Sequence, residues 1–166
     1  MNTSILTVVL AGVMLAGQNG SPTWQNSYAT AQRMGIEQQK PVLVVIGNGD
    51  HGWKQVIGET TPETTQILTQ KYVCVYVDTA TTAGKLLAHS FEISGAGLVV
   101  SDRTGGYQAF WHQGNMTGGA LTSVLTRYSD SHFSFRGTET NAARNSFYPS
   151  AGIPANFAPF QPTASC

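Results

Sequence analysis

Residues 42–47, with the sequence VLVVIG, form the feature that most limits how this chain can fold. The run is apolar at every position, is rich in β-branched side chains and follows Pro41. A short apolar run without alternation is typical of a strand covered on both faces in a parallel or mixed sheet. We therefore expect this strand to be central, with helices on both sides of the sheet.

The segments on either side of this run alternate between helical and strand patterns. Residues 24–36 predict a helix that Pro41 ends, because the residue before a proline is pushed out of the α region. The apolar side chains near helical spacing are Trp24, Tyr28, Ala31, Met34 and Ile36. Thr61 and Pro62 mark a further helix start, as N-cap and first helical residue, and residues 72–79 predict a second strand.

The second half of the pattern runs to residue 128. Residues 83–93 and 117–128 predict helices, and residues 97–101 and 107–112 predict a hairpin whose DRTGG turn has two glycines to supply positive φ. On the buried sides of the two helices we expect Leu86, Leu87, Phe91, Leu121, Val124, Leu125 and Tyr128. Strands that alternate with helices, followed by a hairpin, indicate an α/β fold with a mixed sheet.

Four stretches together resemble the thioredoxin-like superfamily, especially its secreted bacterial branch. They are KPVLVVIGN with the following Trp, TPETTQILTQKYVCVYVDT, FEISGAGLVVSDRTGGYQAFWHQG and LTSVLTRY, and they span about residues 24–128. The resemblance implies a three-layer fold, in which a central mixed sheet is flanked by helices, and an irregular C-terminal tail follows it. The family's Cys-x-x-Cys motif falls here on Asp50, His51, Gly52 and Trp53, and its cis-proline falls on Gly97.

The family needs cysteine at these positions because a helix N-terminus lowers a thiol's pKa, and a second thiol resolves the mixed disulfide. Neither Asp50 nor Trp53 can do this. The chain thus lacks both the motif and the cis-proline, and we expect no thiol–disulfide oxidoreductase activity, no catalytic residue of that kind, no cofactor and no metal.

Two interpretations of this turn stay open. Asp50 is placed to cap the helix that begins near Trp53, and Trp53 to act as a hydrophobic plug rather than a stacking platform. Alternatively, Asp50 and His51 act as an acid–base pair or as metal ligands. A zinc site needs at least three protein groups, and the other candidates are His89 and His112. Asp78 and Asp102 follow strands, where turn or capping roles are expected.

Residues 1–20 form a separate N-terminal segment whose apolar run, from Ile5 to Ala16, is too short to span a membrane. It predicts either a signal peptide removed near Gly17 or an apolar segment that is kept. Charged residues make up only 11% of the chain and its net charge is zero, which excludes a typical nucleic-acid binder and favours a secreted, periplasmic or cell-surface protein.

Residues 130–166 form a Pro-, Gly- and Asn-rich tail after a predicted domain at 21–129. The tail and its start hold aromatic residues that are candidates for interaction: Phe133, Phe135, Phe147, Tyr148, Phe157 and Phe160. Such a tail could pack on its own domain, dock on another subunit or partner, or be disordered. We expect Cys74 to be an inert core thiol and Cys166 to be free or intermolecular, although a disulfide between them is possible in an oxidising compartment.

Two functional hypotheses follow. In the first, the protein is a redox-inactive, exported thioredoxin-like domain that binds a protein partner or assembles with itself through its surface and aromatic tail. In the second, it is a metal-binding or hydrolytic protein that uses Asp50 and His51 at the former thiol site.

Overall fold

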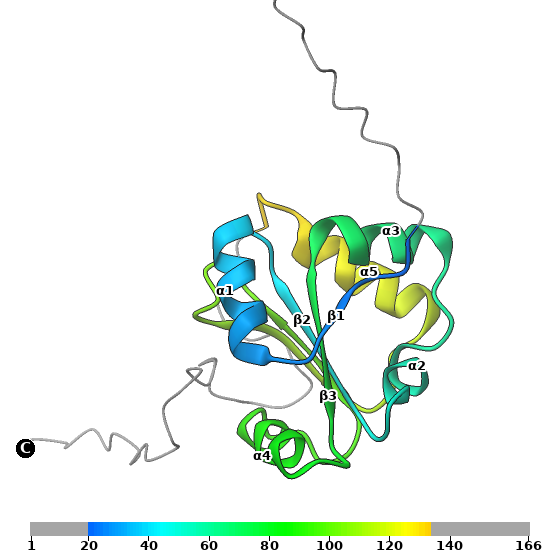
Figure 1. Cartoon of the computed structure of the whole chain (residues 1–166). Coiled ribbons are helices and arrows are strands. Elements are labelled where there is room, and N and C mark those ends of the chain that lie inside the picture. The colour runs from blue at the N-terminus through cyan, green and yellow to red at the C-terminus, as the bar shows by residue number, and fades with distance from the viewer. Residues whose placement is uncertain (1–19, 134–166) are drawn as a thin grey trace, which may run out of the picture.

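The computed structural model describes residues 20–133, which form a five-stranded sheet in the order β1-β3-β2-β4-β5 (Figure 1). The strands are β1 Trp24–Gln25, β2 Val42–Gly47, β3 Val73–Asp78, β4 Gly97–Ser101 and β5 Gln108–Gln113. The helices are α1 Tyr28–Gln38, α2 Gly52–Ile57, α3 Pro62–Lys71, α4 Thr82–Ser90 and α5 Gly118–Ser129. No helix in this part of the chain is both long and apolar enough to cross a membrane.

The strand β2 lies at the centre of the sheet, as the sequence predicts. It pairs in parallel with β3 and antiparallel with β4, and all six of its residues are buried. The prediction of a mixed sheet is therefore confirmed.

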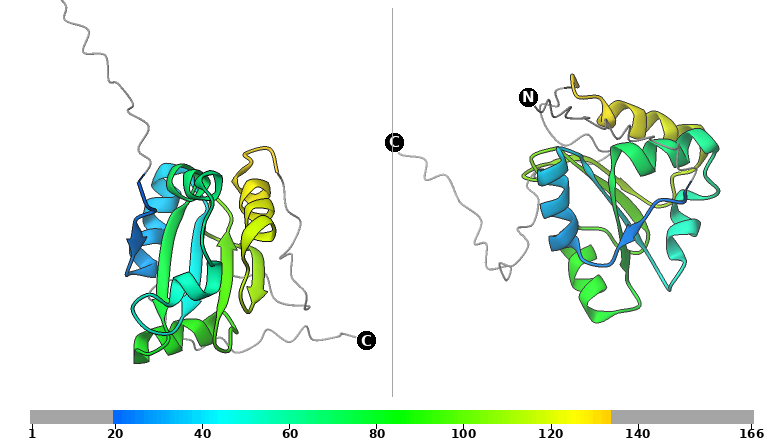
Figure 2. Two further views of the ribbon diagram at one scale, coloured as in Figure 1. Left: turned by 90° about the vertical axis from the view of Figure 1, so that its right-hand side faces the viewer. Right: turned by 45° about the horizontal axis from the view of Figure 1, so that its top comes forward.

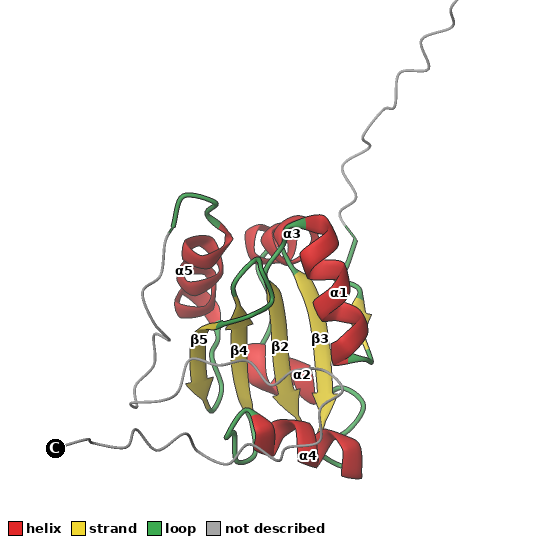
Figure 3. Cartoon of the chain, turned by 90° about the vertical axis from the view of Figure 1, so that its left-hand side faces the viewer, coloured by secondary structure: helices red, strands yellow, loops and turns green. Residues whose placement is uncertain are grey.

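Helices cover both faces of the sheet. Val42, Val44 and Ile46 of β2 belong to a core that includes side chains from α1 and α4, whereas Leu43 and Val45 belong to a second core with α2, α3 and α5. Figure 3 shows α1 and α4 in front of the sheet, and the right view of Figure 2 shows them on the other side of the sheet from α2, α3 and α5. The alternation of side chains along β2 thus divides its apolar residues between two helical layers.

The predicted helix from residue 24 is wrong over its first residues. Trp24 and Gln25 form β1 instead, which pairs in parallel with Cys74 and Val75 of β3. The helix α1 begins at Tyr28, after the N-cap Ser27 accepts a hydrogen bond from the Thr30 amide. Trp24 has helical spacing from Tyr28, but pairing with β3, which makes β1 the edge strand, outweighs that spacing.

Two short helices separate β2 from β3. The first, α2, ends at Ile57, and α3 begins as predicted, with Pro62 at its start and the Thr61 hydroxyl accepting from the Thr64 amide at 3.1 Å. The hairpin of β4 and β5 and the helix α5 also form at the predicted places. In the hairpin turn, only Gly105 has a positive φ, of 66°, so the prediction for both glycines is half right.

The helix α4 buries a narrower face than its sequence suggests. Phe91, its C-cap, is 1% exposed and Leu87 packs partly against the core, but Leu86 is 66% exposed. The prediction that Leu86 is buried is therefore wrong. The helix lies across one end of the sheet, so only one side of it contacts the core (Figure 1).

We expect Phe91→Ala to lower the free energy of unfolding by about 3–5 kcal/mol, because it empties a fully buried aromatic site. Leu86→Ala, five residues earlier on the same helix, should change it by less than about 0.5 kcal/mol. Urea denaturation of the two variants measures both values. Similar losses in the two would contradict the orientation of α4.

Candidate functional site

The turn after β2 is held in place by two polar side chains of β3. The Gly49 amide donates to Oδ1 of Asp78 at 2.7 Å, and the Tyr76 hydroxyl donates to the Gly49 carbonyl oxygen. Gly49 itself has a φ of 80°, which glycine adopts without strain. The turn that leads into α2 is therefore fixed to the neighbouring strand.

A further pair of bonds joins the same ends of β2 and β3. Both the amide and the hydroxyl of Thr79 donate to the Gly47 carbonyl oxygen at 2.8 Å. Asp78 Oδ1 also accepts from the Ala80 amide at 2.8 Å, the turn role predicted for it, and Asp102 accepts from the Tyr107 amide at 3.1 Å in the hairpin turn. The bonds from Thr79 to Gly47 and from Gly49 to Asp78 hold the carboxyl ends of β2 and β3 together as one rigid edge of the sheet.

Asp50 lies on this edge but does not cap α2. The N-cap position is His51, which makes no side-chain capping bond, and Asp50 is exposed. The Gly52 amide instead donates to the Gly49 carbonyl oxygen at 3.0 Å. A backbone turn over residues 49–52 therefore leads directly into the helix. The prediction of Asp50 as N-cap is therefore wrong, because the helix begins one residue too late for its side chain.

Position 52 requires glycine because its backbone lies close to the Tyr76 side chain of β3. A Cβ on Gly52 would lie 2.4 Å from the Tyr76 hydroxyl oxygen, well inside contact distance. Burial raises the pKa of Tyr76, the charges of Asp78 and Asp50 raise it further, and a backbone group of Gly52 lowers it in part. The hydroxyl is therefore protonated at neutral pH and can donate to Gly49.

Trp53 is half-buried against the core of α2, α3 and α5. Its ring lies 5.1 Å from that of Trp24, with the planes tilted by 30°, and Lys54 Nζ lies 5.4 Å from its centre. One side of Trp53 is thus covered by the β1 tryptophan.

Gly97 lies at the start of β4, opposite Ile46 at the end of β2. It is therefore at the same edge of the sheet as the turn before α2. A Cβ here would meet Ile93 Cδ1 at 2.7 Å and the His112 carbonyl oxygen at 2.9 Å, so packing alone calls for glycine. The peptide bonds of residues 20–133 are all trans.

Cys74 is 2% exposed, in the core between the sheet and α3. Its thiol lies 3.7 Å from the Leu68 carbonyl oxygen, and burial raises its pKa to about 12. The prediction of a buried core thiol is confirmed, while Cys166 lies outside the described residues.

The histidine candidates do not gather at the turn. His89 lies on α4, and His112 lies on β5 with its ring stacked on Phe110 at 6.5 Å. Within residues 20–133, no three His, Cys, Asp or Glu side chains lie close enough together to hold a metal ion.

Of the candidate aromatic residues of the tail, only Phe133 lies within the described chain. Its ring meets Tyr128 edge-on at 5.4 Å, and the Arg127 guanidinium lies 4.6 Å from its centre. Phe133 thus packs on the end of α5. The others, Phe135, Phe147, Tyr148, Phe157 and Phe160, lie outside the described residues.

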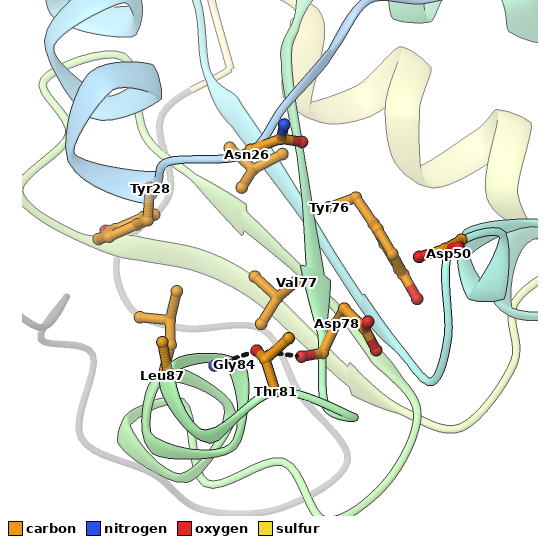
Figure 4. Close-up of a pocket in the computed structure, with 11 residues that line it drawn as sticks. Asn26, Tyr28, Asp50, Tyr76, Val77, Asp78, Thr81, Gly84 and Leu87 are labelled. Carbon is orange, nitrogen blue, oxygen red and sulfur yellow. Dashed lines mark hydrogen bonds between the residues drawn. The ribbon is translucent and has the colours of Figure 1, made fainter.

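A pocket of about 460 Å³ opens beside the turn, at the edge of β3 (Figure 4). β1 pairs with β3 only as far as Val75, and the pocket begins where that pairing stops. Asp50, Tyr76 and Asp78 line one side, and Asn26 and Leu87 contribute from the start of α1 and from α4. The sequence placed Asp50 and Asp78 after two strands but gave no signal that Asn26 and Leu87 would join them.

No family model matches the chain, and no curated protein matches it in sequence. Among solved structures it is similar to a DsbH oxidoreductase, with a TM-score of 0.51 and 15% identity over 78% of this chain and 94% of that one. A second is the oxidised C-terminal domain of DsbD from Neisseria meningitidis, with a TM-score of 0.47 and 13% identity over 64% of this chain and 99% of that one. The first likeness shows the fold, and the predicted thioredoxin-like α/β architecture is confirmed.

We expect Gly52→Ala to destabilise the fold by about 1–3 kcal/mol, because its Cβ displaces the Tyr76 hydroxyl. Tyr76→Phe removes the hydroxyl and costs about 1 kcal/mol by itself. In the Tyr76→Phe background the cost of Gly52→Ala should fall by about 0.5 kcal/mol or more, a coupling that a double-mutant cycle in urea measures.

Gly119→Ala, in a part of α5 where nothing lies within 4 Å of the new Cβ, is the matched control and should not lower stability. Additive effects of Gly52→Ala and Tyr76→Phe would show that the two residues are not in contact.

Proposed function

We propose that this protein is a thioredoxin-like domain that does not exchange disulfides and instead binds a protein partner or assembles with itself. We also propose that it is exported, with residues 1–20 as its targeting segment, residues 21–129 as the domain and residues 130–166 as an extended tail.

The observation that carries the proposal is the chemistry of the turn between β2 and α2. In a thioredoxin-like oxidoreductase this place holds a thiolate at a helix N-terminus. Here it holds Asp50, His51, Gly52 and Trp53, and the only cysteine of the described residues, Cys74, is buried with a raised pKa. A buried neutral thiol is neither nucleophilic nor accessible to a disulfide.

The surface supports a binding role. The turn and the start of α2 keep exposed or half-exposed side chains of mixed character: Asp50 is exposed, and the Lys54 ammonium lies over the half-exposed ring of Trp53. The chain carries few charges, so little charge repulsion opposes association. The spaced aromatic residues of the tail are the segment we propose for contact with a partner or with a second copy.

The competing hypothesis is that Asp50 and His51 bind a metal or act in hydrolysis. The double variant Asp50→Ala/His51→Ala tests it directly. Under our proposal, the wild type and the variant bind Zn²⁺ and Co²⁺ equally weakly in a titration followed by absorption spectroscopy. Loss of a bound metal, or of a hydrolytic turnover, in the variant would refute our proposal and establish the alternative.

Thiol chemistry is tested in a Cys166→Ser variant, whose one remaining thiol is Cys74. At pH 8 the native variant should react with iodoacetamide at least about 100-fold more slowly than the urea-unfolded one, because a group with a pKa near 12 is almost wholly protonated there. The full chain should also fail to speed the reduction of insulin by dithiothreitol. Rapid alkylation in the native state, or catalysis of insulin reduction, would contradict a redox-inactive domain.

The role of the tail is tested by ending the chain after Phe133, which keeps the contact of Phe133 with Tyr128. We expect the full chain to associate with rising concentration and the shortened chain to stay monomeric and folded, as measured by light scattering and circular dichroism. A full-length variant with Phe147, Tyr148, Phe157 and Phe160 changed to Ser should behave as the shortened chain does. A full chain that is monomeric at high concentration would exclude self-assembly.

A further inference from the structure

We propose that the pocket beside β3 binds the guanidinium group of an arginine side chain from a partner protein. This inference rests on the proposed binding function and names the chemistry of the partner. Figure 4 shows the hydroxyl end of Tyr76 with Asp50 and Asp78 on either side of it, and Leu87 across the pocket.

The charge of the pocket favours a cation. Two carboxylates, Asp50 and Asp78, belong to its lining, which has no Lys, Arg or His among the described residues. In a chain whose net charge is zero, this is a local concentration of negative charge. Both carboxylates would repel an anion that entered the pocket.

The two carboxylates differ in the hydrogen bonds that they already accept. Asp78 Oδ1 already accepts from the Gly49 and Ala80 amides, which fixes the orientation of its side chain. Asp50 is exposed, and no hydrogen bond within residues 20–133 uses its carboxylate. A ligand therefore meets one oriented carboxylate and one that can turn toward it.

The helix end at the pocket does not provide an anion site either. The Thr81 hydroxyl accepts from the Gly84 amide at 3.0 Å and donates to the Asp78 carbonyl oxygen at 2.9 Å. The first turn of α4 is thus capped by its own side chain. The Gly84 amide is therefore already bonded within the protein.

The remaining lining fits the stem and the plane of an arginine. Val75, Val77 and Leu87 provide apolar surface for the methylene stem, and the rings of Tyr28 and Tyr76 line the pocket as well. A guanidinium group is planar, so it can donate to two carboxylates at once and also stack on an aromatic ring. A lysine ammonium is a compact charge that has no plane to stack. The volume of about 460 Å³ is in the range of about 300–1,000 Å³ that is usual for small binding sites.

The position of the pocket also fits a peptide partner. β1 leaves the edge of β3 after Val75, and Tyr76, Val77 and Asp78 continue along the pocket without β1 beside them. An extended peptide can run along such an edge while its side chain enters the pocket. The arginine is therefore carried by a polypeptide in this proposal.

The probe is the blocked tripeptide acetyl-Gly-Arg-Gly-amide, titrated into the full chain and followed by amide chemical shifts. Shifts should appear at residues 26, 50, 76–78 and 81–84, and added salt should weaken the binding because it screens charge. The same peptide with citrulline, which keeps the shape of arginine without its charge, should bind at least about tenfold more weakly.

Three variants locate the site. Asp50→Asn should weaken binding by about tenfold, as expected for one lost charge-assisted hydrogen bond. Ala83→Phe, at an exposed position of α4 that lines the pocket, should abolish binding by filling it. Glu59→Gln, an exposed residue away from the pocket, makes the same charge change and should leave binding unaltered. Thermal melts establish that all three are folded.

Equal binding of the citrulline peptide, or unchanged binding in Asp50→Asn and Ala83→Phe, would overturn the arginine site. Equal or tighter binding of acetyl-Gly-Lys-Gly-amide would overturn its preference for a guanidinium. If none of the peptides binds, the arginine site is refuted, but the proposal of a redox-inactive binding domain is not. Insulin reduction by the full chain would refute the redox-inactive function without testing the pocket.

Discussion

The burial of β2 on both faces is the constraint on which the rest of the structure depends. A strand that is apolar at every position needs a strand on each edge for its backbone groups and a layer of helices on each face for its side chains. The strands β3 and β4 pair with its two edges. The helices α1 and α4 cover one face, and α2, α3 and α5 cover the other. The mixed three-layer fold follows from this one segment.

The end of β2 sets the geometry of the candidate site. Once β2 and β3 are paired in parallel, their carboxyl ends lie at one edge, and Thr79, Asp78 and Tyr76 can reach the backbone of the turn that follows β2. The turn is held by polar groups of its neighbour instead of by a cap on its own helix. This leaves Asp50 facing solvent and the pocket, and it makes Gly52 necessary, since Tyr76 occupies the space of a side chain.

In this fold, the same edge can serve two kinds of chemistry. A thiol at the start of the helix would make it a redox site, because the backbone amides there stabilise a thiolate. With a carboxylate and an aromatic ring in its place, the rigid edge presents charge and apolar surface side by side, the combination on which recognition of a cationic side chain depends. The proposals made for the turn and for the pocket therefore concern one surface, built by the same bonds between β2 and β3.

The sequence by itself determined the elements whose signals are local and strong. The apolar run of β2, the Thr61–Pro62 helix start, the hairpin of β4 and β5 and the apolar face of α5 were all predictable, because each depends on residues close in the chain. Only the tertiary structure decided that Trp24 joins an edge strand, that Leu86 faces solvent and that Asp50 stands one residue too early to cap α2. It alone brought Asn26, Tyr76 and Leu87 around one pocket. Pairing partners, the width of a buried helix face and the lining of a pocket are set by contacts between residues far apart in the chain, and no local pattern encodes them.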